Sequence, residues 1–123
     1  MRSALTILVI ASLHGMVCAE TQINSAAGYD IMTSRQSGNC IACHELPGVQ
    51  GLVSNFGPSL QGVGARWNRA QLTQWVKDAR QINPNTLMPP FGSATSLTKA
   101  NPPRAILSDA QITQVVDTLQ SWQ

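Results

Sequence analysis

The stretch Cys40-Ile41-Ala42-Cys43-His44 contains two cysteines three positions apart, with a histidine directly after the second. Two cysteines at this spacing can bind a zinc ion, cycle between dithiol and disulfide, or hold a haem covalently. Which chemistry applies depends on what the rest of the chain supplies.

The first part of the chain, residues 1–19, has the layout of a secretory signal peptide. Arg2 gives a positive start, residues 4–11 are apolar, and residues 17–19 end in Cys18 and Ala19, small residues suited to cleavage. The apolar run is too short to span a bilayer. We expect cleavage after Ala19 and an exported, soluble domain of residues 20–123, without membrane insertion. A retained anchor or acylation of Cys18 is the alternative.

Few metal-binding residues remain once the predicted leader is removed. Cys40 and Cys43 are then the only cysteines, and His44 is the only histidine. A zinc site needs four ligands, and these residues supply three. A redox motif of this spacing is expected within a βαβ pattern, which is not visible. The sequence therefore predicts one haem c attached covalently through Cys40 and Cys43.

The charge of the predicted mature domain is close to neutral. Of the eight basic residues only Arg2 lies in the leader, and six acidic residues balance the others. The domain has no run of Lys or Arg. Nothing in this pattern indicates binding to nucleic acid or to an anionic membrane surface.

Helical patterns dominate the domain. Apolar residues at helical spacing predict helices over about residues 23–36 and 68–83, and Gly28 in the first suggests close approach by another element. The clearest helix follows Ser108, which with Gln111 forms a capping box. Its apolar stripe comprises Ile112, Val115, Val116, Leu119 and Trp122. We predict a small all-α fold of three to four helices, with long loops around one haem.

His44 is the predicted proximal ligand of the haem iron, because it follows the second attachment cysteine. The candidates for the opposite side of the iron are, in order, Met88, Met32, Lys77 and Lys99. Met88 is favoured because two prolines restrict its loop, whereas Met32 lies on a predicted helix where core packing is the default. If protein side chains occupy both sides of the iron, no position is open for a substrate, which predicts electron transfer. An open iron site would instead indicate a haem enzyme or a gas sensor.

Two further residues are candidates for supporting roles. Pro47 offers a carbonyl that can accept a hydrogen bond from the His44 imidazole and orient the ring. Arg66 is a candidate partner for a haem propionate, since a guanidinium binds carboxylates with two hydrogen bonds. An ordinary solvated arginine is the alternative for Arg66.

The order Cys40, Cys43, His44, Gly57-Pro58-Ser59-Leu60, Met88 resembles class I c-type cytochromes. This resemblance implies a fold in which the first and last helices cross, so that Gly28 faces the stripe of the last helix. The segments GNCIACH (38–44), NFGPSLQGVGARW (55–67) and QINPNTLMPPFG (81–92) further resemble the SoxX family. Phe56 departs from the smaller aliphatic residue expected there.

The SoxX resemblance implies a periplasmic, mono-haem electron-transfer subunit in a heterodimer with SoxA. In that family SoxA holds the haem at which thiosulfate is joined oxidatively to a cysteine of a sulfur-carrier protein, an L-cysteine S-thiosulfotransferase activity. The electrons then pass to SoxX, which is not catalytic alone. The carrier protein and a small cytochrome acceptor are further implied partners. A free-standing cytochrome c shuttle is the alternative, although the near-neutral charge offers no steering patch.

Overall fold

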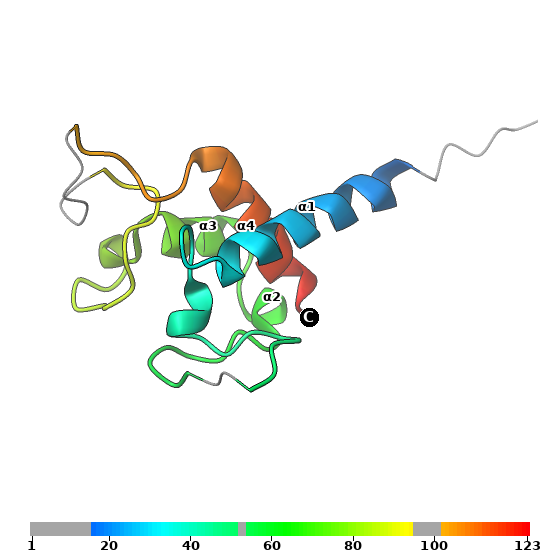
Figure 1. Ribbon diagram of the computed structural model, residues 1–123, viewed down its shortest axis with the longest axis horizontal. Helices are drawn as coiled ribbons and strands as arrows, with labels where there is room; N and C mark the ends of the chain where they lie inside the picture. Colours follow the sequence, from blue (N-terminus) through cyan, green and yellow to red (C-terminus); the bar gives the residue numbers. More distant parts are fainter. Residues whose placement is uncertain (1–15, 52–53, 95–101) are drawn as a thin grey trace, which may run out of the picture.

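The computed structural model describes residues 16–51, 54–94 and 102–123, with side chains from Ser25 onwards. Within these ranges the chain forms α-helices and short 3-10 helices and no strand, so the predicted all-α class is confirmed (Figure 1). The elements in chain order are α1 (Met16–Thr33), η1 (Cys40–Ala42), α2 (Val63–Arg66), α3 (Arg69–Asp78), η2 (Ala79–Gln81) and α4 (Asp109–Ser121).

The helix ends follow from local hydrogen bonds. The Ser108 hydroxyl accepts from the amide of Gln111, whose side chain accepts from the amide of Ser108, so the predicted capping box of α4 is confirmed. Asn68 and Gln71 cap α3 in the same reciprocal way. α3 ends at Asp78, earlier than predicted, because the Asp78 carboxylate accepts from the next turn and the chain tightens into η2.

α1 starts earlier than the predicted helix of residues 23–36 and also ends earlier, at Thr33. Its start at Met16 carries it across the predicted cleavage point after Ala19. Beyond its last residue, the Ser37 hydroxyl and the Gly38 amide both donate to the carbonyl of Ile31, at 3.1 and 3.0 Å, and turn the chain toward η1. The apolar run of the predicted leader, residues 4–11, lies outside the described residues.

The first and last helices cross in direct contact (Figure 1). A Cβ atom at Gly28 would collide with the backbone carbonyl of Gln114 and the hydroxyl of Thr118, so only glycine permits this approach. The buried Thr118 hydroxyl donates to the carbonyl of Ser25 at 2.6 Å. The predicted contact of Gly28 with the last helix is confirmed, although it meets α4 beside the apolar stripe.

α4 also supports α2 and α3. The amide of Gly64 in α2 donates to the carbonyl of Trp122 at 2.8 Å, and a Cβ at position 64 would meet backbone carbonyls of α4. Two ion pairs join α3 to α4: Arg69 with Asp117, and Lys77 with Asp109 at 3.2 Å. Each of the other α-helices therefore packs on α4.

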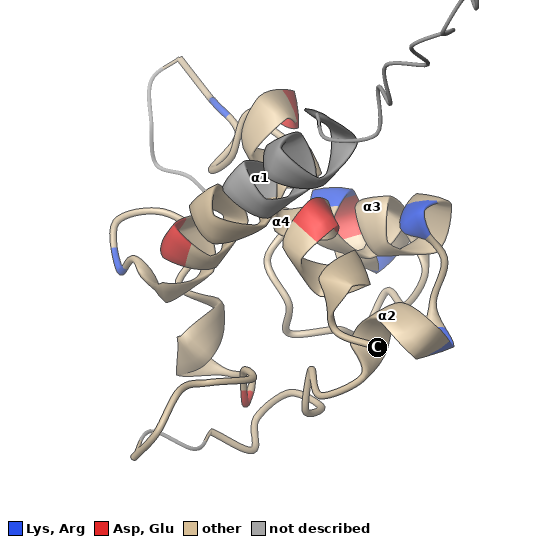
Figure 2. Ribbon diagram, turned by 90° about the vertical axis from the view of Figure 1, so that its right-hand side faces the viewer, with Lys and Arg blue, Asp and Glu red and all other residues tan. Residues whose placement is uncertain are grey.

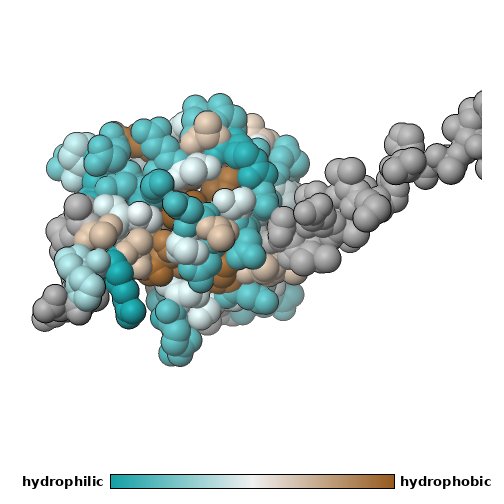
Figure 3. All heavy atoms as spheres, turned by 90° about the horizontal axis from the view of Figure 1, so that it is seen from above, coloured by the Kyte–Doolittle hydropathy of each residue, from teal (hydrophilic) through white to brown (hydrophobic). Residues whose placement is uncertain are grey.

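One apolar core lies between the helices and is completed by the loops. Hydrophilic residues cover most of the face in Figure 3, with apolar residues visible between them. No helix in the described ranges is long and apolar enough to cross a membrane. The buried core residues are Met32, Leu46, Val63, Leu72, Val76, Phe91, Leu107, Ile112, Val115, Val116 and Leu119.

Helix propensity and the contact between α1 and α4 predict opposite effects of Gly28→Ala on stability. Propensity alone would make Gly28→Ala stabilising by about 1 kcal/mol. Because the added methyl group meets α4, we expect the variant to lose about 1–3 kcal/mol of unfolding free energy. Urea denaturation followed by circular dichroism measures this. Ala26→Gly, at an exposed position of α1, calibrates the propensity term. A more stable Gly28→Ala protein would contradict the close crossing.

Candidate functional site

The two cysteines lie at the ends of one tight turn. Asn39 opens the turn in the left-handed region, at φ 47°, a conformation that asparagine tolerates. The amides of Cys43 and His44 then both donate to the carbonyl of Cys40, at 3.1 and 2.9 Å. The backbone thus holds the three predicted site residues together in η1 and the residues that follow it.

Both cysteines are free thiols, in different surroundings. Cys40 packs against the apolar core, whereas Cys43 is exposed. Burial raises the pKa of the Cys40 thiol to about 11, so this thiol stays protonated at neutral pH. Among the described residues no three His, Cys, Asp or Glu side chains gather as metal ligands, so the four ligands of a zinc site are not assembled there.

A backbone carbonyl orients the imidazole of His44. Its Nδ1 atom lies 2.8 Å from the carbonyl oxygen of Pro58. Because a carbonyl can only accept, Nδ1 carries the proton and Nε2 keeps its lone pair. An imidazole held in this tautomer presents Nε2 to a metal, with its ring direction set by the bond at the other nitrogen.

The loop that supplies this carbonyl is held against the cysteine turn by backbone hydrogen bonds. The amide of Gly57 donates to the carbonyl of Cys43 at 2.7 Å, and the amide of Leu60 to that of Glu45 at 2.9 Å. The orienting carbonyl therefore comes from Pro58, and the prediction of Pro47 was wrong. Pro47 is closer to His44 in the sequence, but the loop that carries Pro58 folds back on residues 43–45.

Gly57 leaves the space that the ring occupies. A Cβ atom at this position would lie 2.5 Å from Cε1 and 2.7 Å from Nδ1 of His44, well inside contact distance. The Gly-Pro pair therefore has two separate uses, because the glycine makes room for the imidazole and the proline carbonyl orients it.

Arg66 holds the same loop from its far end. Its two terminal nitrogens donate to the carbonyls of Gln61, at 2.6 Å, and Ser59, at 3.0 Å. Gly62, at φ 61°, turns the chain so that α2 returns the guanidinium to the loop. In this structure the exposed guanidinium, predicted as a candidate for a propionate, is engaged with the backbone that carries Pro58.

The candidates for a second iron ligand differ sharply in their surroundings. Met32 is 1% exposed and belongs to the core, and the ammonium group of Lys77 pairs with Asp109. Lys99 lies outside the described residues. Met88 is half-buried in the loop after η2, and its amide donates to the Thr86 hydroxyl at 3.2 Å.

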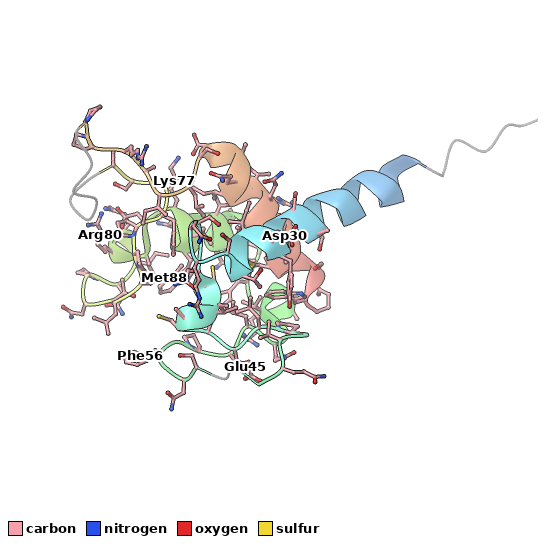
Figure 4. All side chains as sticks on the ribbon, in the orientation of Figure 1. Asp30, Glu45, Phe56, Lys77, Arg80 and Met88 are labelled. Carbon is pink, nitrogen blue, oxygen red and sulfur yellow. The ribbon has the colours of Figure 1, made fainter. Side chains whose placement is uncertain are left out.

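Met88 and Cys40 pack against the same core cluster, although they come from distant parts of the chain. Figure 4 shows Met88 beside η1 in this projection. The loop is joined to the helical body through the amide of Gly92, which donates to the carbonyl of Lys77 at 2.9 Å, and through Leu107, whose amide donates to Phe91 at 2.8 Å.

A cysteine turn with an oriented imidazole, inside crossed first and last helices, is the arrangement of a c-type cytochrome. Residues 24–101 match the family model described as Cytochrome C oxidase, cbb3-type, subunit III. This range exceeds half of the chain, and the chain therefore belongs to the c-type cytochromes, whose cofactor is haem c.

Within this family the chain is similar to a chain in the crystal structure of SoxXA from P. pantotrophus. The two are 32% identical, the match covers 80% of this chain and 81% of that chain, and the TM-score is 0.73. The predicted class I cytochrome c-like fold and the similarity to SoxX are confirmed. Among curated proteins no sequence matches this chain.

The residues present fit haem c. The two cysteines are free thiols, as thioether formation requires, and the proton on Nδ1 of His44 leaves Nε2 available for iron. The absence of a side chain at Gly57 leaves room for the ring. The sulfur and nitrogen atoms that would bind haem come from the turn of residues 40–44, and the loop of residues 57–60 orients the imidazole.

Gly57 provides a test of this arrangement. Because an added methyl group meets the imidazole, we expect Gly57→Ala to break the bond between His44 and Pro58 and to lower stability by about 1–3 kcal/mol. The nitrogen-15 shifts of the His44 ring report the loss of the Nδ1 hydrogen bond. Gly51→Asn is the control, because that glycine has no atom within 4 Å of an added Cβ and asparagine tolerates its positive φ. An unchanged ring signal in Gly57→Ala would contradict the geometry.

Proposed function

We propose that this chain is the electron-transfer subunit of a SoxAX-type complex. The observation that carries the proposal is its similarity to a chain of SoxXA, at 32% identity over 80% of this chain and 81% of that one. A match that extends over most of both chains supports the same role more strongly than the attachment motif, which many c-type cytochromes share.

In the proposed site, thioether bonds to Cys40 and Cys43 attach a single haem. Nε2 of His44 and the sulfur of Met88 are the proposed iron ligands. The bound haem supplies a one-electron couple, and two protein ligands leave no open position for a substrate. The hydrogen bond from His44 to Pro58 supports this assignment, as does the location of Met32 in the core.

The chain's own residues hold this site in one geometry. The loop of residues 57–60 is bonded to residues 43–45 on one side and held by Arg66 on the other. A ring fixed in this way needs little rearrangement when the charge on its metal changes, which suits fast electron transfer. A methionine ligand raises the reduction potential relative to a second nitrogen ligand.

The proposed partner is a SoxA haem subunit, in a heterodimer. Joining thiosulfate to a thiol of the sulfur-carrier protein forms a sulfur–sulfur bond and releases one proton and two electrons. With a single attachment motif, this chain would pass those electrons one at a time to an acceptor such as a small cytochrome. The chain has no substrate chemistry of its own in this proposal. The reaction belongs in the periplasm, after cleavage behind Ala19.

The role of Met88 can be tested by substitution. Because axial ligands set haem potentials over a range of about 0.8 V, we expect Met88→Ala to lower the reduction potential by on the order of 0.1–0.3 V. The absorption band of methionine-to-iron charge transfer in the oxidised protein should also disappear. Met32→Leu is the matched control, since it replaces a core methionine at similar volume and should change neither property. An unaltered spectrum in Met88→Ala would favour an open-site haem enzyme or gas sensor.

The partner can be tested by purification of the native protein. We expect the haem-loaded chain to elute with a second haem subunit at low and at high salt, because the near-neutral domain has no run of Lys or Arg whose ion pairs salt would screen. Size-exclusion chromatography with mass spectrometry identifies the two subunits and the mature N-terminus. Elution as a monomer under both conditions would contradict the SoxAX proposal and favour a free shuttle.

A further inference from the structure

Large apolar side chains are exposed at a few positions of the described chain. Phe56 is 80% exposed and Leu87 is 87% exposed, whereas Trp67 and Ile82 are each 40% exposed. Trp67 has a neighbour that accounts for it, because its ring meets that of Trp75 edge to face with centroids 6.4 Å apart. Phe56 and Leu87 are the marked cases, since burying either would remove most of its surface from water.

Charged residues are absent from the two segments that carry these side chains. Residues 46–65 and residues 81–98 contain no Asp, Glu, Lys or Arg. Three of the four exposed large apolar residues, Phe56, Ile82 and Leu87, lie in these segments. Figure 2 shows charged residues on α1, α3 and α4 and on some of the loops. Between Glu45 and Arg66, which lies at the end of α2, the sequence contains no charged residue. The charged residues of the chain therefore all lie outside these two segments.

The two uncharged segments are also those that complete the haem site. Phe56 directly precedes Gly57 and Pro58, which position His44, and Leu87 directly precedes Met88. Figure 4 shows Phe56 and Met88 on the same side of the molecule. An electron leaves a protein most quickly where a partner comes closest to the iron ligands, so an exposed apolar surface at this position is well placed for a redox partner.

We propose that Phe56, Ile82 and Leu87 form the docking surface for the SoxA-type subunit, through an uncharged apolar contact. This inference rests on the proposed function. The partner's matching surface should itself be apolar and free of charge, because a charge buried against these segments would find no countercharge in them. A second copy of this chain would carry the same uncharged segments, but the similar chain comes from a complex named for two components.

The chemistry of the surface predicts its mode of binding. Interface centres are depleted of charge, and aromatic anchors at such centres carry much of the binding energy. Phe56 is aromatic and 80% exposed, which makes it the expected anchor. A contact of this kind gains little from electrostatic steering and suits a standing complex rather than a salt-dependent encounter.

The test uses the haem-loaded chain and its purified haem partner. We expect Phe56→Glu and Leu87→Glu each to raise the dissociation constant at least tenfold, and Phe56→Ser and Leu87→Ser to raise it by less. Ala110→Glu is the matched control, because it adds the same charge at an exposed position in the first turn of α4. Affinity of the unchanged pair should vary by less than about threefold between about 50 mM and about 500 mM NaCl.

The isolated variants must keep the haem spectrum and reduction potential of the unchanged chain, which separates docking from support of the haem. Loss of either property even in the serine variants would mean that these side chains cover the haem, and would overturn the proposal. Unaltered affinity in both glutamate variants would overturn it while leaving the proposed function intact. Failure of the unchanged chain to bind the partner would overturn both. Self-association abolished by the same substitutions would assign the surface to a second copy.

Discussion

The close crossing of α1 and α4 at Gly28 is the contact on which the rest of the structure depends. It joins the first and last described helices, so the chain between them must start from and return to the same core. α4 then supports α2 and α3 on its other sides. The loops between these helices are held at both ends, and this is how segments without regular structure keep one geometry around the cysteine turn.

The site itself is built mainly from backbone groups. The turn that carries Cys40 and Cys43 closes on its own carbonyl, and the His44 ring is directed by the carbonyl of Pro58. Backbone carbonyls do not titrate, so this orientation holds over a wide range of pH. Arg66 braces the loop from outside, because its guanidinium donates to two further carbonyls. A permanent charge and neutral dipoles therefore hold the ring of His44 in one orientation.

Ion-paired residues and uncharged segments occupy different parts of the sequence. Ion pairs join α3 to α4, whereas residues 46–65 and 81–98, which include Pro58 and Met88, contain no charged residue. The apolar side chains of Phe56 and Leu87 remain exposed beside the proposed haem site. Docking of the proposed partner subunit on these side chains would account for their exposure.

The sequence alone determined the helical class and the capped start of α4, because these depend on residues near one another in the chain. A glycine inside a predicted helix indicated the close approach at Gly28, and a count of possible ligands over the whole chain indicated the chemistry of the cysteine motif. Only the tertiary structure decided that Pro58 and not Pro47 orients His44, that Arg66 braces the loop, and that Met32 lies in the core while Met88 remains half-buried. Those outcomes depend on how a loop without a periodic pattern folds back. Hydrogen bonds between distant backbone groups leave no signal in residue spacing, so they appear only once the chain is folded.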